Sequence, residues 1–229
     1  LRGVSFRAAP GETVALVGHT GAGKSTVLSL LLRFYAPTRG RILVDGVDLA
    51  SLAHDDLRGR IGLVPQDLFL FRGDLSRNLV LDRAIPQAQL DRALAAVGAD
   101  ALIERLPGGL AHQLSERGRS LSVGERQILS FARALAGEPT ILLLDEATSA
   151  VDPESETRLQ RALGRLRAGR TALVVAHRLG TIVDADRILV FHHGELLETG
   201  SHRELLRQGG LYERLVRLQG GEPRRAVGA

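Results

Sequence analysis

One glycine-rich stretch near the start of the chain has residue types and spacing suited to binding phosphate groups. It matches the pattern G-x-x-x-x-G-K-[ST] and reads Gly18, His19, Thr20, Gly21, Ala22, Gly23, Lys24 and Ser25, followed by Thr26. Glycines let backbone N–H groups converge on phosphate oxygens, and the N-terminus of a following helix adds partial positive charge. In this pattern Lys24 reaches the β- and γ-phosphates of a nucleotide, and Ser25 offers a hydroxyl to Mg²⁺. The alternative is a glycine turn that only caps a helix.

Lys24 is the only lysine in a chain whose lysines and arginines total 30. Arginine's planar fork does not replace a compact ammonium in a tight loop, whereas an ordinary surface charge can be either residue. Retention of this single lysine, at this position, favours the phosphate-binding interpretation over the helix cap.

Two carboxylates with possible catalytic roles, Asp145 and Glu146, directly follow an apolar run at residues 141–144. A fully apolar strand is typical of the interior of a parallel sheet, and ligands bind at the carboxyl ends of such strands. Asp145 is predicted to hold Mg²⁺ through water, and Glu146 to polarise an attacking water molecule. Read without the glycine-rich loop, the two carboxylates could instead cap the helix that follows.

These residues need a scaffold, and the hydrophobic pattern predicts one in which strands alternate with helices. Strands are expected at 1–7, 13–17, 41–45, 61–64, 141–144, 171–176, 187–191 and 195–199. Helices are expected at 24–34, 123–136, 154–166, 202–207 and 211–218, and the pattern is helical over much of 67–138. Such alternation implies an α/β fold with a mainly parallel sheet covered on both faces, here interrupted by an inserted helical lobe.

Composition narrows the class of protein. Hydrophobic residues make up 44%, enough for a proper core, and there is no cysteine for disulfides or thiolate metal sites. The pI near 10.4 follows from a slight excess of arginine, because the formal net charge is only +4. Like charges are scattered along the chain rather than clustered. We therefore expect no nucleic-acid partner. No stretch approaches the roughly 18 apolar residues of a membrane helix. His192 and His193 lack an evident metal-ligand spacing and are predicted to lie on the surface of a hairpin.

Four further segments follow the glycine-rich loop in an order that resembles the nucleotide-binding domains of ABC (ATP-binding cassette) transporters. They are Val64-Pro65-Gln66-Asp67, Leu121-Ser122-Val123-Gly124-Glu125, Ser149-Ala150-Val151-Asp152 and His177. The resemblance covers nearly the entire chain. It implies a P-loop NTPase core with a mainly parallel sheet, an N-terminal antiparallel β portion and an inserted helical lobe, with ATP and Mg²⁺ as cofactors.

The resemblance also implies a role for each of these segments. Gln66 would contact Mg²⁺ or the attacking water and sense a membrane domain. Ser122 and Gly124 would grip the γ-phosphate of ATP held by an opposite subunit in a head-to-tail dimer. Asp152 would lie in the loop that crosses the dimer interface, and His177 would contact the γ-phosphate. ATP hydrolysis would then depend on Glu146 together with His177 and Gln66.

Three segments resemble exporters within this family. They are 70–79, 116–118 and 200–205, although Asp74 and Arg77 depart from the usual threonine and glutamate. We therefore expect an ATPase that powers export at the cytoplasmic face of the cell membrane. The expected organisation is an ATPase core at 1–66 and 139–219, a helical lobe at about 67–138, and a flexible tail at 220–229. Because the chain opens at Leu1 rather than Met, we expect transmembrane segments and the family's adenine-stacking aromatic residue to lie upstream.

The segment at 121–125, called the signature in this family, departs from its usual form L-S-G-G-Q at Val123 and Glu125. Valine restricts a backbone that glycine leaves free, and a carboxylate is unhelpful beside a phosphate. This favours a different, paired partner subunit over an identical copy, since a homodimer would place the altered signature over both ATP sites. The other functions considered are a detached importer subunit, an ABC ATPase that acts on DNA or ribosomes, and a binding module that closes on ATP without hydrolysing it.

Overall fold

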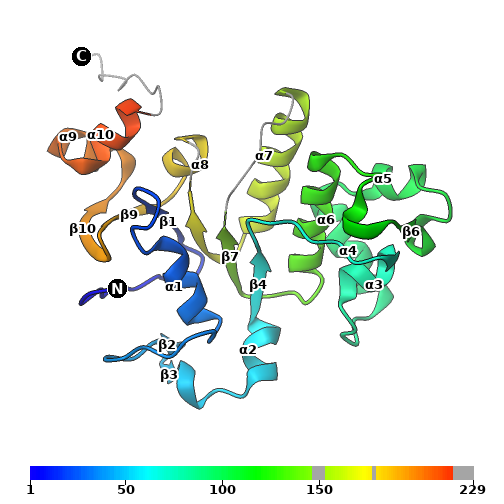
Figure 1. Ribbon diagram of the computed structural model, residues 1–229, viewed down its shortest axis with the longest axis horizontal. Helices are drawn as coiled ribbons and strands as arrows, with labels where there is room; N and C mark the ends of the chain where they lie inside the picture. The colour runs from blue at the N-terminus through cyan, green and yellow to red at the C-terminus, as the bar shows by residue number, and fades with distance from the viewer. Residues whose placement is uncertain (146–152, 177–178, 219–229) are drawn as a thin grey trace. The chain divides into compact units, whose positions relative to one another are not determined.

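The computed structural model describes residues 1–145, 153–176 and 179–218. The chain divides into two compact units, one formed by Leu1–Leu52 with Thr171–Ala229 and the other by Ala53–Arg170. In Figure 1 the first unit combines the blue N-terminal elements with the yellow-to-red C-terminal ones. The second unit holds the cyan to yellow-green elements that lie between these two segments in the sequence.

The first unit is built on four hydrogen-bonded strands. β1 (Thr13–Val17) lies between β8 (Thr171–Val175) and β9 (Arg187–His192) and is parallel to both, while β10 (Glu195–Gly200) runs antiparallel to β9. All five residues of β1 are buried. A strand with a neighbour on each side and both faces covered must be almost entirely apolar, which explains the uninterrupted run after Thr13.

Helices and one small hairpin complete the first unit. They are α1 (Lys24–Leu31), the hairpin of β2 (Leu43–Val44) and β3 (Val47–Asp48), the single turn η1 (Leu49–Ser51), α8 (Leu179–Val183), α9 (His202–Gln208) and α10 (Leu211–Leu218). A 2.6 Å hydrogen bond between His202 Nδ1 and Tyr212 Oη joins α9 to α10. Tyr212 is only 1% exposed, so this bond gives its buried hydroxyl a polar partner.

The second unit pairs two parallel strands with a group of helices. β4 (Ile61–Val64) lies beside β7 (Ile141–Asp145), with Val64 opposite Leu144 at their carboxyl ends. The helices are α2 (His54–Arg60), α3 (Leu75–Val80), α4 (Gln87–Val97), α5 (Asp100–Arg105), α6 (Val123–Leu135) and α7 (Pro153–Arg167). Two single turns, η2 (Gly109–Ala111) and η3 (Glu116–Gly118), flank β6 (Gln113–Leu114), which pairs antiparallel with β5 (Gly73–Asp74). α6 packs against α3, α4, α7 and β4, so its apolar residues form the centre of this unit.

The predicted fold class is confirmed: the fold is α/β, with mainly parallel strands and short antiparallel pairs. The strand predicted at 13–17 coincides with β1, and the helix predicted at 123–136 is α6 with one residue fewer. Helices α3 to α6 all begin and end inside the stretch predicted as a helical lobe. The limits of that lobe, 67 and 138, stay a prediction.

Three predicted elements need correction. The strand predicted at 1–7 is wrong, because Gly3 turns the backbone with φ of 60° and the segment makes one backbone bond to the rest of the described chain, from Arg2 N–H to Gly194 O. The strand predicted at 41–45 is reduced to the two residues of β2. The helix predicted at 24–34 ends at Leu31, since Arg33 adopts a left-handed φ of 57° that a continuing helix does not allow.

Gly62 in β4 provides a test of packing in the second unit. A Cβ added there would lie 2.6 Å from Ala134 O and 2.8 Å from Pro139 Cγ, closer than atoms in a packed core can approach. We expect Gly62→Ala to lower the free energy of unfolding by about 1–3 kcal/mol, measured by urea denaturation. The matched control is Gly59→Ala in α2, where the added Cβ meets nothing within 4 Å and the change should be neutral or slightly stabilising. Equal stability of the two variants would contradict this packing argument.

Candidate nucleotide-binding site

The predicted phosphate loop directly follows β1 and leads into α1, as the strand-loop-helix pattern requires. Gly18 has φ of 150°, and a Cβ added there would lie only 2.3 Å from Phe191 O, so the loop backbone touches the end of β9. Gly23 caps α1 in a left-handed conformation with φ of 103°. Both positions need glycine for a structural reason, and Gly23, as the N-cap, leaves the backbone N–H groups at the start of α1 without a side-chain cap.

Lys24 lies inside this loop. Its side chain is 5% exposed, and its ammonium donates hydrogen bonds to Gly18 O at 2.8 Å and His19 O at 3.0 Å. A buried ammonium requires polar partners, and the loop's own carbonyl groups supply them. The positive charge is therefore fixed within the curve of the loop, where a phosphate chain could be bound.

Ser25 and Thr26 are exposed on the first turn of α1. The side chain of Ser25 is thus accessible to a ligand, while its carbonyl accepts a 2.9 Å hydrogen bond from Ser29 Oγ. The other predicted residues of the loop, His19, Thr20, Gly21 and Ala22, connect Gly18 to Gly23, and Ala22 is fully buried. All nine predicted phosphate-binding positions, 18–26, lie in one continuous loop and helix start.

Asp145 and Gln66 belong to the second unit, at the carboxyl edge of its strand pair. Asp145 is the last residue of β7, and Gln66 is exposed two residues after β4 ends. Since β4 and β7 are parallel neighbours, their carboxyl ends share one edge, the edge at which α/β sheets bind ligands. Asp145 Oδ1 is buried and has no hydrogen-bond partner among the described residues. An orphaned, buried carboxylate oxygen fits a role in holding Mg²⁺, directly or through water.

The predicted signature residues lie at the N-terminus of α6, as expected. Ser122 is the N-cap: its Oγ accepts from Glu125 N–H at 3.2 Å, and Glu125 Oε2 accepts from Ser122 N–H at 2.8 Å. Gly124 is buried within the first turn. The sequence pattern S-x-x-E at 122–125 is the signal for this capping box and for the start of α6.

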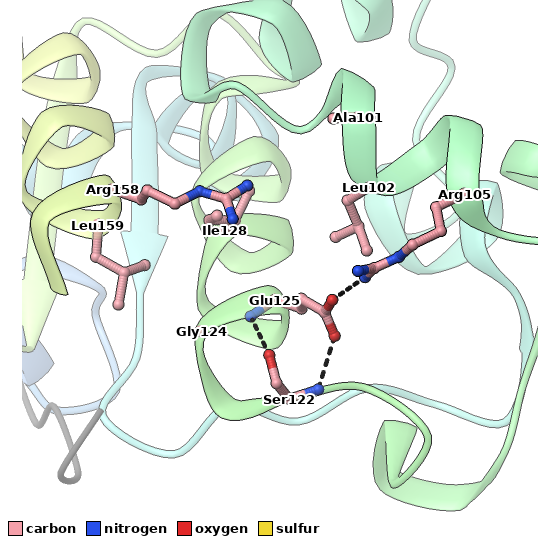
Figure 2. A pocket seen from close by; sticks show the side chains of 9 residues that line it. All are labelled: Ala101, Leu102, Arg105, Ser122, Gly124, Glu125, Ile128, Arg158 and Leu159. Atoms are coloured by element: carbon pink, nitrogen blue, oxygen red, sulfur yellow. Dashed lines mark hydrogen bonds and ion pairs between the residues drawn. The ribbon is translucent and has the colours of Figure 1, made fainter. Parts of the chain in front are cut away.

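Arg105 is a residue that the sequence did not single out. Its guanidinium, from α5, forms an ion pair with Glu125 beside a cavity of about 380 Å³, and Figure 2 shows the two side chains pointing toward each other. Burial alone would raise the pKa of the Glu125 carboxyl, but hydrogen bonds from Ser122 and Arg105, together with the charge of Arg105, outweigh it and lower that pKa. Glu125 is thus ionised and neutralised by a partner. Leu102, Ile128 and Leu159 supply apolar lining to the same cavity.

Three predicted site residues lie outside the described residues. They are Glu146, Asp152 and His177. The other predicted residues fall into three groups: the phosphate loop of the first unit, the β4–β7 edge of the second unit, and the start of α6. The roles predicted for all of them stay predictions.

Comparison with known proteins agrees with this arrangement. A family model described as ABC transporter matches residues 1–149. The chain is 49% identical over 224 residues to an ATP-dependent lipid A-core flippase of Chromobacterium violaceum, covering 97% of the chain and 38% of the flippase. It is 47% identical over 220 residues to a fatty acid ABC transporter ATP-binding/permease protein of Mycobacterium tuberculosis, covering 95% of the chain and 34% of that protein.

Among solved structures, a bacterial Atm1-family ABC exporter with ATP bound superposes with a TM-score of 0.88 at 43% identity, covering 98% of this chain and 40% of the exporter chain. The chain thus spans roughly a third of the length of its curated relatives, 33% of one Bacillus subtilis protein. Within the described residues no helix has the length and apolar character needed to cross a membrane. The match to the family model and the position of the phosphate loop lead to one conclusion: the chain belongs to the ABC transporter family.

Proposed function

We propose that this chain binds and hydrolyses Mg-ATP to power export of a substrate, at the cytoplasmic face of the cell membrane. The observation that carries the proposal is the ammonium of Lys24, buried within a glycine-rich loop between β1 and α1. Such a loop presents backbone N–H groups and one fixed positive charge, which suits a triphosphate. Relatives named as ATP-binding/permease proteins and a lipid flippase favour export over an importer or a module acting on DNA or ribosomes.

In this proposal the chain positions ATP mainly by electrostatics. The loop at 18–26 binds the phosphates, and Lys24 neutralises charge on the β- and γ-phosphates. Ser25, Gln66 and Asp145 are the residues that would hold Mg²⁺, and when bound the ion would neutralise further charge on the phosphate oxygens.

The remaining proposed step is activation of the attacking water. Glu146 would accept a proton from that water as its oxygen bonds to the γ-phosphorus, while the bond from the γ-phosphorus to the β–γ bridging oxygen breaks and ADP leaves with that oxygen. His177 would contact the γ-phosphate. Gln66 orients the water. A general base of this kind contributes roughly 10²–10⁴ in rate.

A transmembrane partner is part of the proposal, and the second unit has a surface suited to it. Phe69 and Phe71, just after Gln66, are 46% and 54% exposed and stack edge to face with ring centroids 4.9 Å apart. Buried Asn78 fixes this segment, accepting from Phe71 N–H at 2.7 Å and donating to Phe71 O at 2.9 Å. Exposed aromatic pairs held on a rigid backbone are typical of interaction sites. The exposed rings of Phe69 and Phe71 therefore support the proposal that this segment contacts a membrane domain.

The second partner is another nucleotide-binding domain, which we propose to be a different, paired subunit. Ser122 and Gly124 would contact the partner's ATP, and Asp152 would lie at the interface. Two findings bear on why the altered signature would matter. The carboxylate of Glu125 is neutralised by Arg105, and the φ angle of Val123 is not positive. Neither the negative charge nor backbone strain alone therefore disables the signature. The proposal rests on the side chain of Val123, which is bulkier than glycine beside the partner's phosphate.

The export proposal is tested with the full-length protein reconstituted in lipid vesicles. We expect six hydrophobic spans upstream of this chain and ATP hydrolysis that moves a lipophilic substrate across the bilayer. Hydrolysis without membrane spans upstream would favour an importer subunit or a non-transport ATPase instead. Absence of hydrolysis with intact ATP binding would favour a binding module.

The partner proposal has its own test, in which this chain is expressed with the candidate second subunit. Val123→Gly combined with Glu125→Gln should raise turnover at the partner's ATP site by about tenfold or more, because backbone donors then approach the γ-phosphate freely. The measurement is single-site hydrolysis with the other site disabled. The control is Gln113→Ala, which lies outside the signature and should leave turnover unchanged. Vigorous ATPase activity of the full-length chain expressed alone would contradict the proposal of a different partner.

A further inference from the structure

Three histidines that are far apart in the sequence meet at one place in the first unit. His19 is the second residue of the phosphate loop, His192 is the last residue of β9, and His193 begins the turn into β10. One ring nitrogen of each lies within 4.8 Å of those of the other two. The ring centroids are 4.2–5.1 Å apart. The sequence predicts His192 and His193 on the surface of a hairpin; His193 is exposed, His192 is half-buried, and His19 lies beside both.

The hydrogen bonding of His19 leaves one of its nitrogens available. Its Nδ1 lies 2.7 Å from Thr20 O, and since a carbonyl oxygen only accepts, Nδ1 is the donor. In the neutral ring Nε2 then carries the lone pair, and Nε2 is buried without a hydrogen-bond partner among the described residues. A backbone carbonyl that fixes the far nitrogen is the usual arrangement for a metal-ligating histidine.

His192 also has a ring nitrogen without a hydrogen-bond partner in the described part of the chain: its Nδ1, which is buried. Two buried ring nitrogens without partners among the described residues, on rings whose centroids are 5.1 Å apart, are unfavourable, because each lost its water on folding. A ligand that accepts both lone pairs would remove this cost.

The backbone that carries the three rings is held tightly together. Gly194 N–H donates to Ala22 O at 3.0 Å, which joins the hairpin turn to the phosphate loop. His193 has φ of 47° and Gly194 has φ of 82°, so both turn residues are left-handed. Histidine, like asparagine and aspartate, is enriched among the non-glycine residues that adopt this conformation. The turn therefore fixes the backbone of His193 with its ring beside two other imidazoles.

We propose that His19, His192 and His193 bind a divalent transition-metal ion of the zinc type. Three imidazole nitrogens suit Zn²⁺, Cu²⁺ or Ni²⁺, whereas Mg²⁺ prefers oxygen ligands, so this site is separate from the proposed Mg²⁺ position. In a tetrahedral zinc site the nitrogens lie about 3.4 Å apart. Closing from at most 4.8 Å needs a shift of at most roughly 1.4 Å, which is within the reach of rotations of the imidazole side chains. The fourth position would stay open to water or to another ligand.

The test is titration of the tag-free, nucleotide-free chain with Zn²⁺ by isothermal calorimetry. We expect one ion per chain with a dissociation constant in the micromolar range or below. His192→Gln combined with His193→Asn should weaken binding at least about 100-fold, since two of three ligands are lost. Asparagine tolerates the left-handed turn, so the hairpin should be retained. The matched control is His54→Gln combined with His112→Gln, which removes two other histidines and should leave the affinity unchanged.

Thermal unfolding provides a second readout that also shows whether each variant is folded. Zinc at 100 times its dissociation constant should raise Tm by about 5–10 °C in the unmodified chain and the control, but not in the variant of His192 and His193. Three results would overturn the proposal: no saturable zinc binding, equal affinity in a folded variant of His192 and His193, or loss of binding in the control. None of these outcomes depends on ATP, so the proposal can fail while the proposed function stands.

Discussion

Lys24→Ala should weaken binding of Mg-ATP by at least about 100-fold, because hydrogen bonds to a charged group contribute about 1.5–3 kcal/mol each and several would be lost. In the structure the ammonium is 5% exposed and already placed within the loop by Gly18 O and His19 O. At the proposed site ATP would therefore meet a positive charge whose position is fixed before binding, which would lower the entropic cost of association. Isothermal titration with Mg-ATP measures the affinity.

Two controls show whether position or charge matters. Lys24→Arg keeps the charge but replaces a compact ammonium by a planar fork, so we expect its affinity to fall as well. Arg217→Ala removes an exposed positive charge on α10 and should leave the affinity unchanged. If folded Lys24→Ala binds Mg-ATP as tightly as the unmodified chain, the phosphate-loop assignment is wrong.

The elements predicted most accurately are those that are marked by residues close together in the sequence. β1 was placed residue for residue because a five-residue buried strand bounded by Pro10-Gly11 and a glycine-rich loop has clear ends. α6 was placed within one residue because its apolar positions repeat with helical spacing. The segment 1–7 has alternating apolar residues too, but a strand also needs a neighbour to bond with, and the sequence cannot indicate whether one is there.

Contacts between residues that are distant in the chain could not be predicted from the sequence. Glu125 looked unfavourable beside a phosphate, yet Arg105, 20 residues earlier, neutralises it. The histidine cluster is a similar case. β1 and β9 are parallel neighbours, with Val17 opposite Val190, so the segments after them meet at one edge. Once that pairing is known, His19 and His192 must lie close together, although 173 residues separate them in the chain.

The second large effect is expected at Glu146. Glu146→Gln should keep Mg-ATP binding but reduce turnover by roughly 10²–10⁴, because glutamine preserves the shape of the side chain and cannot accept the proton of the attacking water. Its neighbour Asp145 ends β7 with one buried oxygen that has no hydrogen-bond partner among the described residues, at the strand edge where we propose that Mg-ATP binds. Since ATP would remain uncleaved, the dimer that encloses it should persist, which sedimentation in the presence of ATP can detect.

The control for Glu146→Gln is the same exchange at Glu138, an exposed residue paired with Arg92, which should leave turnover unchanged. Both variants need to be measured in the full-length protein, where the two nucleotide-binding domains of the proposed transporter would be held together and the local concentration of each would be high. A loss in turnover with unchanged ATP affinity identifies a group used only in the transition state. Hydrolysis by the Glu146 variant within about threefold of the unmodified transporter would mean that another group activates the water, since a factor of three is far below the contribution of a general base.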